Sequence, residues 1–193
     1  MRFFILVRRL ILGVSLVGLI GLIQACSPRM DWREVRLDPI GGSALFPGKP
    51  VEVSRSLQIS GESDAVTLTL RSARIDNTVF AVGWALNGQS DTREKLEAAM
   101  LANISAESVQ RSQQTLHHSD QVIHEVIASG EMRLRPDSDP VPARLWMRSL
   151  SILPAQPEQG DPVRIIEIIA AGPAQELREE DARLFIESLK LSR

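Results

Sequence analysis

The chain has 193 residues, of which 44% are hydrophobic and 24% charged, and its formal net charge is −2. This length allows a leader and one domain but not two full-sized domains. The single cysteine excludes an intramolecular disulfide, so a domain in an oxidising compartment would depend on its hydrophobic core alone. Beyond the first residues there is no basic run, which argues against nucleic acid as a partner.

Residues 1–25 have the pattern of a secretory leader. Residues 10–23 carry no charge, and Arg2, Arg8 and Arg9 precede them. About 20 apolar residues are needed to cross a bilayer, so we expect a cleaved signal peptide, with a retained signal anchor as the alternative. Sec and twin-arginine export both stay open. Cleavage would remove three of 22 basic residues, leaving 19 against 24 acidic ones, a net charge of about −5.

The leader ends in Leu22–Cys26 (LIQAC), and this segment resembles the lipobox of bacterial lipoproteins. The resemblance implies cleavage before Cys26 and fatty acylation, palmitate included, of that cysteine; an unmodified cysteine is the alternative. Residues 26–30 would then be a short lipid tether, since the four residues after Cys26 reach at most ~14 Å. Ser27 is not the aspartate associated with inner-membrane retention. The bilayer partner we expect is therefore the outer membrane, with the domain on its periplasmic face.

In chain order, the first half of the domain has mostly strand patterns. Alternating apolar and polar residues predict a half-buried strand at 51–59 and a second strand at 65–70. Residues 78–86 read as a strand buried on both faces. The other early strands are expected at 31–37 and 44–46. Asp91 with Glu94 suggests a capping box that opens a helix. Leu96, Ala99, Met100 and Asn103 have helical spacing, so the buried stripe is expected to include Leu96 and Met100, with Asn103 as a candidate C-terminal cap.

The second half returns to strands and ends in a helix. A polar edge strand is expected at 107–116, a strand at 122–128 ended by Ser129-Gly130, and further strands at 144–153 and 163–171. Gly172-Pro173 should break the last of these. The closing helix is predicted at 179–189, with Ala182, Phe185, Ile186 and Leu189 facing inward and Glu179, Glu180 and Asp181 at its start, where they favour the helix dipole.

These elements predict an α+β fold, a mainly antiparallel sheet sandwiched or covered by helices, in a single domain from residue 31 to 193. Three segments, Phe46–Pro50, Ala170–Pro173 and Leu184–Leu191, resemble the PsbP-like and DcrB-like α/β/α proteins. The resemblance covers most of residues 31–193 as a pattern of strands and turns. It implies an accessory role at a membrane complex or in the cell envelope, and it brings no catalytic residues.

Candidate chemistry is sparse. His117 or His118 with His124, helped by Glu125 or Asp120, could ligate a metal, but the spacing is generic and we expect no metal and no cofactor. No nucleophile elbow or phosphate loop occurs. Trp84 and Trp146 are expected in the core, and Trp32 either packs or lies at a membrane interface.

The sequence therefore favours a non-catalytic envelope lipoprotein with an accessory or binding role, whose partners are the bilayer and an envelope protein that the sequence does not name. The alternative is a periplasmic module that binds a small ligand or a metal in a pocket between sheet and helix, and a hydrolase is the least favoured hypothesis. A deep polar pocket with perturbed titratable groups would favour the alternative, and a flat apolar patch would favour the accessory role.

Overall fold

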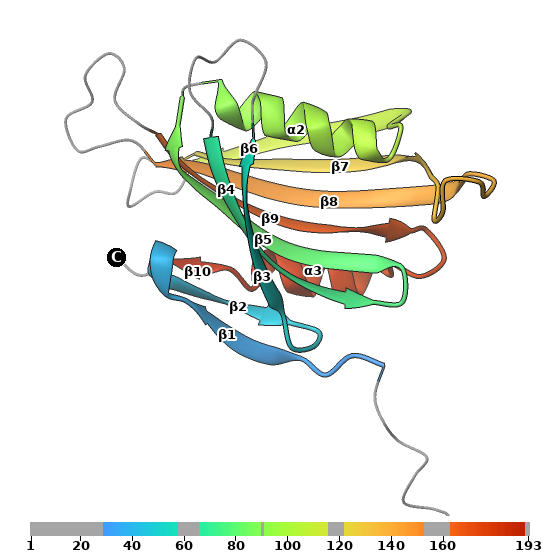
Figure 1. Cartoon of the computed structure of the whole chain (residues 1–193), viewed down its shortest axis with the longest axis horizontal. Helices are drawn as coiled ribbons and strands as arrows, with labels where there is room; N and C mark the ends of the chain where they lie inside the picture. Colours follow the sequence, from blue (N-terminus) through green and yellow to red (C-terminus); the bar gives the residue numbers. More distant parts are fainter. Residues whose placement is uncertain (1–28, 58–65, 90, 116–121, 153–162, 192–193) are drawn as a thin grey trace, which may run out of the picture. The chain divides into compact units, whose positions relative to one another are not determined.

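A computed structural model describes residues 29–57, 66–89, 91–115, 122–152 and 163–191, without the side chains of residues 55–57. Within the unit Asp31–Arg193, a seven-stranded antiparallel sheet dominates (Figure 1). Its strands in spatial order are β3 (Val51–Leu57), β4 (Val66–Ile75), β5 (Thr78–Gly88), β9 (Val163–Pro173), β8 (Val141–Ile152), β7 (Val122–Met132) and β6 (Ser108–Thr115). The α+β class, with a mainly antiparallel sheet, is as the sequence predicts.

A second, three-stranded sheet is built from the two ends of the domain. It consists of β1 (Arg33–Leu37), β2 (Gly42–Phe46) and β10 (Lys190–Leu191), with β2 in the middle and a short 3-10 turn, η1 (Asp38–Ile40), between β1 and β2. Gly41 at the end of η1 has a φ of 64°, a left-handed conformation that glycine adopts without a Cβ penalty. The sequence did not predict β10, which is two residues long.

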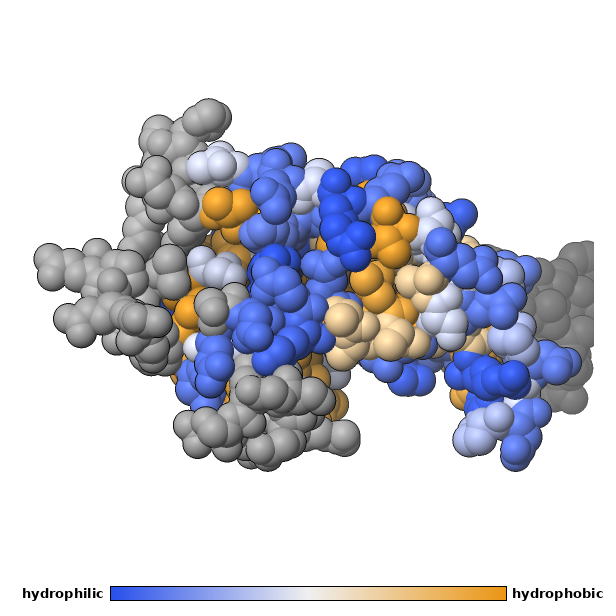
Figure 2. All heavy atoms as spheres, turned by 90° about the horizontal axis from the view of Figure 1, so that it is seen from above, coloured by the Kyte–Doolittle hydropathy of each residue, from blue (hydrophilic) through white to orange (hydrophobic). Residues whose placement is uncertain are grey.

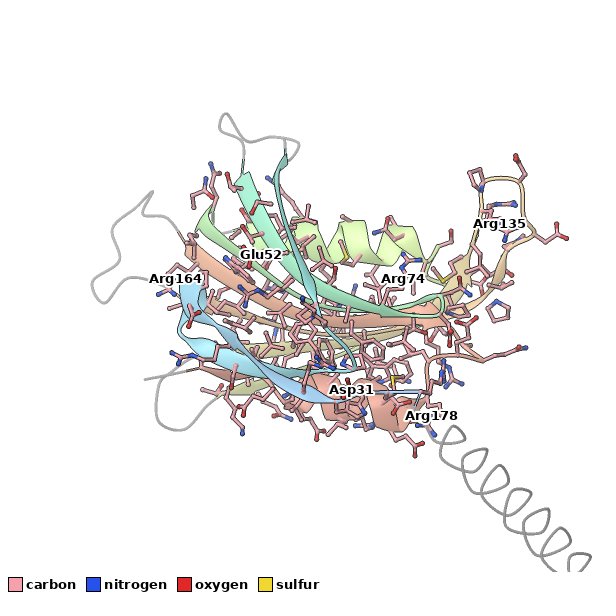
Figure 3. The ribbon with its side chains drawn as sticks, turned by 60° about the horizontal axis from the view of Figure 1, so that its bottom comes forward. Asp31, Glu52, Arg74, Arg135, Arg164 and Arg178 are labelled. Atoms are coloured by element: carbon pink, nitrogen blue, oxygen red, sulfur yellow. The ribbon has the colours of Figure 1, made fainter. Side chains whose placement is uncertain are left out.

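The two helices pack on opposite faces of the large sheet (Figure 1). Helix α2 (Thr92–Asn103) covers the face that carries Leu145 and Ile169, which we call the α2 face. Helix α3 (Glu179–Glu187) and the small sheet lie on the other side, the α3 face, which carries Phe80. Figure 3 turns the α3 side forward and labels Arg178, the residue that precedes α3.

The core on the α3 face is aromatic. Phe185 of α3 is fully buried, and its ring meets Phe46 and Phe80 edge-on, each at a centroid distance of 5.3 Å. Trp32 adds an edge contact to Phe80 at 5.9 Å, so its ring packs against the domain. Such pairs contribute about 0.5–1.5 kcal/mol beyond the area that they bury. Phe185, Ile186 and Ala182 are buried as predicted.

Helix α3 is shorter than the sequence predicts, and Leu189 is only half-buried, beyond the end of the helix. The Ser188 hydroxyl donates to the carbonyl of Phe185 at 2.6 Å and accepts from the amide of Leu45 at 2.9 Å. These bonds turn the chain out of the helix and into β10. A local hydroxyl therefore overrides the apolar periodicity of the last turn.

Two strands continue through glycines that were expected to end them. β7 runs on to Met132, and β9 runs on to Pro173. Gly130 is needed because the carbonyls at the end of α2 come close to it: an added Cβ would lie 2.7 Å from the Ser105 oxygen. At Gly172 an added Cβ would lie 2.7 Å from the Thr78 hydroxyl. Both glycines thus serve close packing rather than a turn.

The strand β3 is not half-buried as its alternation suggests. Val51 and Val53 are exposed, at 65% and 42%. β3 is the outer strand, paired on one side only by β4, so no neighbouring element covers these side chains among the described residues. The prediction of β5 as a strand buried on both faces is confirmed, because residues 80–85 are all buried.

Candidate functional site

A pocket of about 370 Å³ lies between α2 and the last two strands of the sheet. The residues that line it come from α2, β6 and β7: Arg93, Glu94, Glu97, Ala98, Leu101, Arg111, Ser112, Gln113, His124, Glu125 and Val126. Its volume is at the small end of the range of ligand pockets, about 300–1,000 Å³. Figure 2 looks onto the α2 side, where hydrophobic residues gather in one area of the visible surface with hydrophilic residues around them.

The side of α2 that faces the sheet carries both apolar and polar residues. Leu96 packs on Val66, Leu68 and Ile165, and it anchors the N-terminal half of the helix. Of the predicted stripe, Leu96 is buried and Met100 half-buried, and the buried positions also include Thr92 and Glu97. The C-cap is Ile104, not Asn103. The predicted capping box is absent as well, because Asp91 makes no side-chain cap bond and pairs with Lys95 at 3.0 Å.

The buried Glu97 joins the helix to the edge of the sheet. Its Oε1 accepts from Nε of Arg111 on β6 at 2.7 Å, and its Oε2 accepts from Nη1 of Arg93 at 3.3 Å. Arg93 also bonds Glu94. Both oxygens of Glu97 are thus engaged, which offsets the cost of burying its charge. This bridge of one carboxylate and two guanidinium groups forms one wall of the pocket.

A row of polar side chains crosses four strands on the α2 face, and its first two members, Gln113 and His124, line the pocket. Gln113 lies opposite His124, His124 opposite Ser149, and Ser149 opposite Glu167. Directly opposed residues of antiparallel strands point to the same face, so the four side chains lie side by side under α2. The first pair is hydrogen-bonded, with Gln113 Nε2 at 3.2 Å from His124 Nδ1. The row leads from the solvent at β6 to the interior at β9.

The inner half of the row, Ser149 and Glu167, is buried with polar atoms that lack a hydrogen bond to any described residue. Ser149 is fully buried and Glu167 is 2% exposed. Neither the Ser149 hydroxyl nor Oε1 of Glu167 has a hydrogen-bond partner among the residues that the structure describes. Burial raises the pKa of Glu167 to about 8, against the opposing charge of Arg93 and with a further rise from Glu97. The carboxyl is therefore mostly protonated at pH 7, as a buried acid without a cation usually is.

His124 stands at the border between the pocket and this interior. Burial and the nearby charge of Arg93 lower the pKa of His124, although Glu94 and Glu97 act in the other direction. The ring is consequently neutral at pH 7. With the Gln113 amide oriented as in the structure, its N–H donates to Nδ1, which assigns the proton of the neutral ring to Nε2.

The structure brings only part of the predicted chemistry together. Cys26, His117, His118 and Asp120 lie outside the described residues. His124 and Glu125 both line the pocket, and Glu125 also accepts from Arg148 at 2.7 Å. No group of three or more metal-ligating side chains occurs in the described ranges. Trp84 and Trp146 are buried, as predicted.

Sequence reasoning missed Arg93, Glu97, Arg111 and Glu167. Glu167 falls within the strand predicted at 163–171, and Arg111 within the polar edge strand predicted at 107–116. A lone glutamate between two isoleucines on each side was the available signal, since a charge inside an apolar strand must be neutralised or neutral. The sequence around Glu97 does not indicate that this residue is buried, because its burial depends on where α2 packs on the sheet.

Another hollow, of about 540 Å³, lies along β1, β2 and β10. The charged residues that line it, among them Glu34, Arg36, Asp38 and Lys190, are all exposed. A ligand there would compete with water at every contact, so we place the candidate site under α2 instead.

Comparison with known proteins adds no relative: no protein-family model, no curated protein and no solved structure matches the chain. The resemblance to PsbP-like and DcrB-like proteins therefore stays a prediction. Within the described ranges, neither α2 nor α3 has the length and hydropathy of a membrane-spanning helix.

Proposed function

We propose that this chain is a lipid-anchored protein of the bacterial envelope that acts by binding, not by catalysis, and that it binds a small ligand in the pocket under α2. The lipid anchor is proposed at Cys26, on the strength of the leader and the lipobox pattern that precede it. Acylation on two or three chains gives durable attachment, since each buried CH2 contributes about 0.8 kcal/mol. The periplasmic face of the outer membrane is the proposed location.

The observation that supports the binding role is the convergence on one pocket of charged side chains from three elements. Arg93 and Glu97 come from α2, Arg111 from β6 and His124 from β7. A few polar groups beside an apolar lining are the usual composition of a small-molecule site. Among the described residues no serine hydroxyl is hydrogen-bonded to His124: Ser149, opposite His124, is fully buried, and its hydroxyl has no hydrogen-bond partner there. The domain thus fits binding better than hydrolysis.

The anchor is tested by mass spectrometry of the mature N-terminus and by membrane fractionation. We expect an acylated Cys26 at the first position of the mature chain, in membranes that retain the protein after a high-salt wash. Cys26→Ser should be neither acylated nor cleaved at that site. An unmodified Cys26, or an intact leader on the wild-type protein, contradicts the lipoprotein proposal.

The pocket is tested with two matched substitutions on α2. Ala98 lines the pocket, while its neighbour Ala99 is exposed outside it, so Ala98→Trp should fill the pocket and Ala99→Trp should not. The readout is saturation-transfer NMR of a small-molecule extract of the envelope, with the full acylated chain held in lipid nanodiscs. We expect signals with the wild type and Ala99→Trp that are lost with Ala98→Trp. Equal signals from all three proteins would rule out this pocket as the binding site.

A further inference from the structure

The pocket offers a ligand N–H donors on Arg111 and His124. Arg111 is 57% exposed, and only its Nε is bonded, to Glu97. The two terminal nitrogens of its guanidinium make no hydrogen bond to any residue that the structure describes. His124 adds an Nε2–H, since its Nδ1 accepts from Gln113.

The carboxylate beside Arg111 is already engaged. Glu97 uses both oxygens on Arg93 and Arg111, whereas Glu94 and Glu125 each use one oxygen, on Arg93 and Arg148. A cationic ligand beside Arg111 would have to displace a guanidinium from Glu97, whereas a ligand with acceptor atoms meets N–H groups of Arg111 that bond to no other described residue. Charge-assisted hydrogen bonds to such groups are about twice as strong as neutral ones.

Three other residues that line the pocket are apolar, which favours an organic ligand over a bare inorganic anion. Ala98 and Leu101 on α2 face Val126 on β7 across the pocket lining. Leu101 is half-buried and Val126 is buried. The pocket holds a ligand of about 370 Å³ or less. A ligand that leaves Ala98, Leu101 and Val126 in contact with water gains no binding free energy from the burial of these apolar side chains.

We propose that the pocket under α2 binds a small organic carboxylate, which takes hydrogen bonds from Arg111 and His124 and lays a short apolar group against Ala98, Leu101 and Val126. This deepens the binding role proposed above and rests on it. Arg111 and His124 are suited to act together because they are diagonal neighbours: Arg111 is opposite Val126, and His124 is two residues before Val126 on β7.

The test uses three probes, butyrate, butylamine and inorganic phosphate, each titrated at pH 7 into the full acylated chain in nanodiscs. Saturation-transfer NMR follows the binding of butyrate and butylamine, and 31P line broadening follows the binding of phosphate. The signal of empty nanodiscs is subtracted. Arg111→Ala is compared with Arg183→Ala, a surface arginine on α3 that also pairs with a glutamate, Glu179, at 2.8 Å. We expect butyrate to bind the wild type and Arg183→Ala equally, and Arg111→Ala about tenfold more weakly.

Each other outcome overturns a distinct statement. Butylamine binding as tightly as butyrate would reject the carboxylate, and phosphate binding as tightly would reject the organic part. Butyrate binding that Arg111→Ala leaves unchanged would place the carboxylate elsewhere. If no probe binds while Ala98→Trp still removes signals from the envelope extract, the ligand class is wrong and the binding role stands. If that substitution also has no effect, both fall.

Discussion

Ser149 on β8 lies directly opposite Glu167 on β9, and both side chains are buried on the α2 face of the sheet, where the Ser149 hydroxyl and Oε1 of Glu167 have no hydrogen-bond partner among the described residues. An unpaired buried polar group costs about 1–3 kcal/mol, and the cost is higher for a charge. Glu167 limits this cost by keeping its proton, which makes the stability of the domain depend on pH in a way that can be measured.

Glu167→Gln should remove a pH dependence of stability. The pKa of Glu167 rises to about 8 on burial, from 4.5 in an exposed setting, so the folded state holds a proton that the unfolded state releases between these values. This contribution is fully present below about pH 4.5, falls by about 1.4 kcal/mol per pH unit as pH rises toward 8, and is flat above. Urea unfolding of both proteins at pH 5 to 9 measures the difference, and the Gln variant should be the more stable one at pH 8.

The comparison isolates Glu167 because His124, whose lowered pKa gives a slope of the opposite sign below about pH 6.5, is present in both proteins. Glu187→Gln, at an exposed position on α3, is the control and should follow the wild type at every pH. Parallel curves for wild type and Glu167→Gln would mean that Glu167 is ionised in the folded protein.

Glu97→Gln should lower the pKa of Glu167. The negative charge of Glu97 raises the pKa of Glu167, and the positive charge of Arg93 lowers it. When the Glu97 charge is removed, the effect of Arg93 remains, and the pKa of Glu167 falls. The carboxyl 13C shift of Glu167, followed from pH 5 to 10, reports the midpoint directly. Glu94→Gln is the matched control on the same helix and should shift the midpoint less. An unchanged midpoint in Glu97→Gln would show that the two carboxyl groups are not coupled.

Phe185→Ala should cost about 3–5 kcal/mol of unfolding free energy, because the ring is fully buried between Phe46 and Phe80. Thermal and urea unfolding check this value. Leu184→Ala removes a neighbouring side chain that is 44% exposed and should change stability by less than about 1 kcal/mol. Similar losses for both substitutions would contradict the packing of α3 described above.

Gly130→Ala should destabilise the protein by about 2–3 kcal/mol, as overpacking does. An added Cβ would meet the carbonyls of Ile104 and Ser105, which directly follow α2, and backbone atoms have little room to move. Gly48→Ala is the control, because there the nearest atom is Ile75 Cδ1 at 3.7 Å. Equal melting temperatures for Gly130→Ala and the wild type would be inconsistent with this close approach.

The sequence predicted most of the fold because the strands have simple patterns and the helix α3 has a strong apolar stripe. It failed where packing decides: Gly130 and Gly172 look like strand ends but allow close contacts, and Val51 and Val53 look buried but lie on an outer strand. In each case the missing information is the identity of the neighbouring element, which no local window contains.

The candidate site was less predictable than the fold. His124 was considered, but only as a metal ligand with partners nearby in sequence. Its actual neighbours, Gln113, Ser149 and Glu167, come from three other strands, and the register of those strands brings them together. Arg111 and Glu97 are 14 residues apart and meet only because α2 folds back over β6.

The position of β6 at the edge of the sheet has a consequence for how binding can fail. β6 is held by β7 alone among the described strands, and Arg111 and Gln113 reach the α2 face only in the observed alignment. A slip of one residue would turn both side chains to the opposite face. The other six strands of the large sheet and helix α3 would keep their contacts, and α2 would lose the bond between Glu97 and Arg111. Loss of ligand without loss of fold is therefore a failure specific to this outer strand, and substitutions in 108–115 are best judged by binding, not by melting temperature.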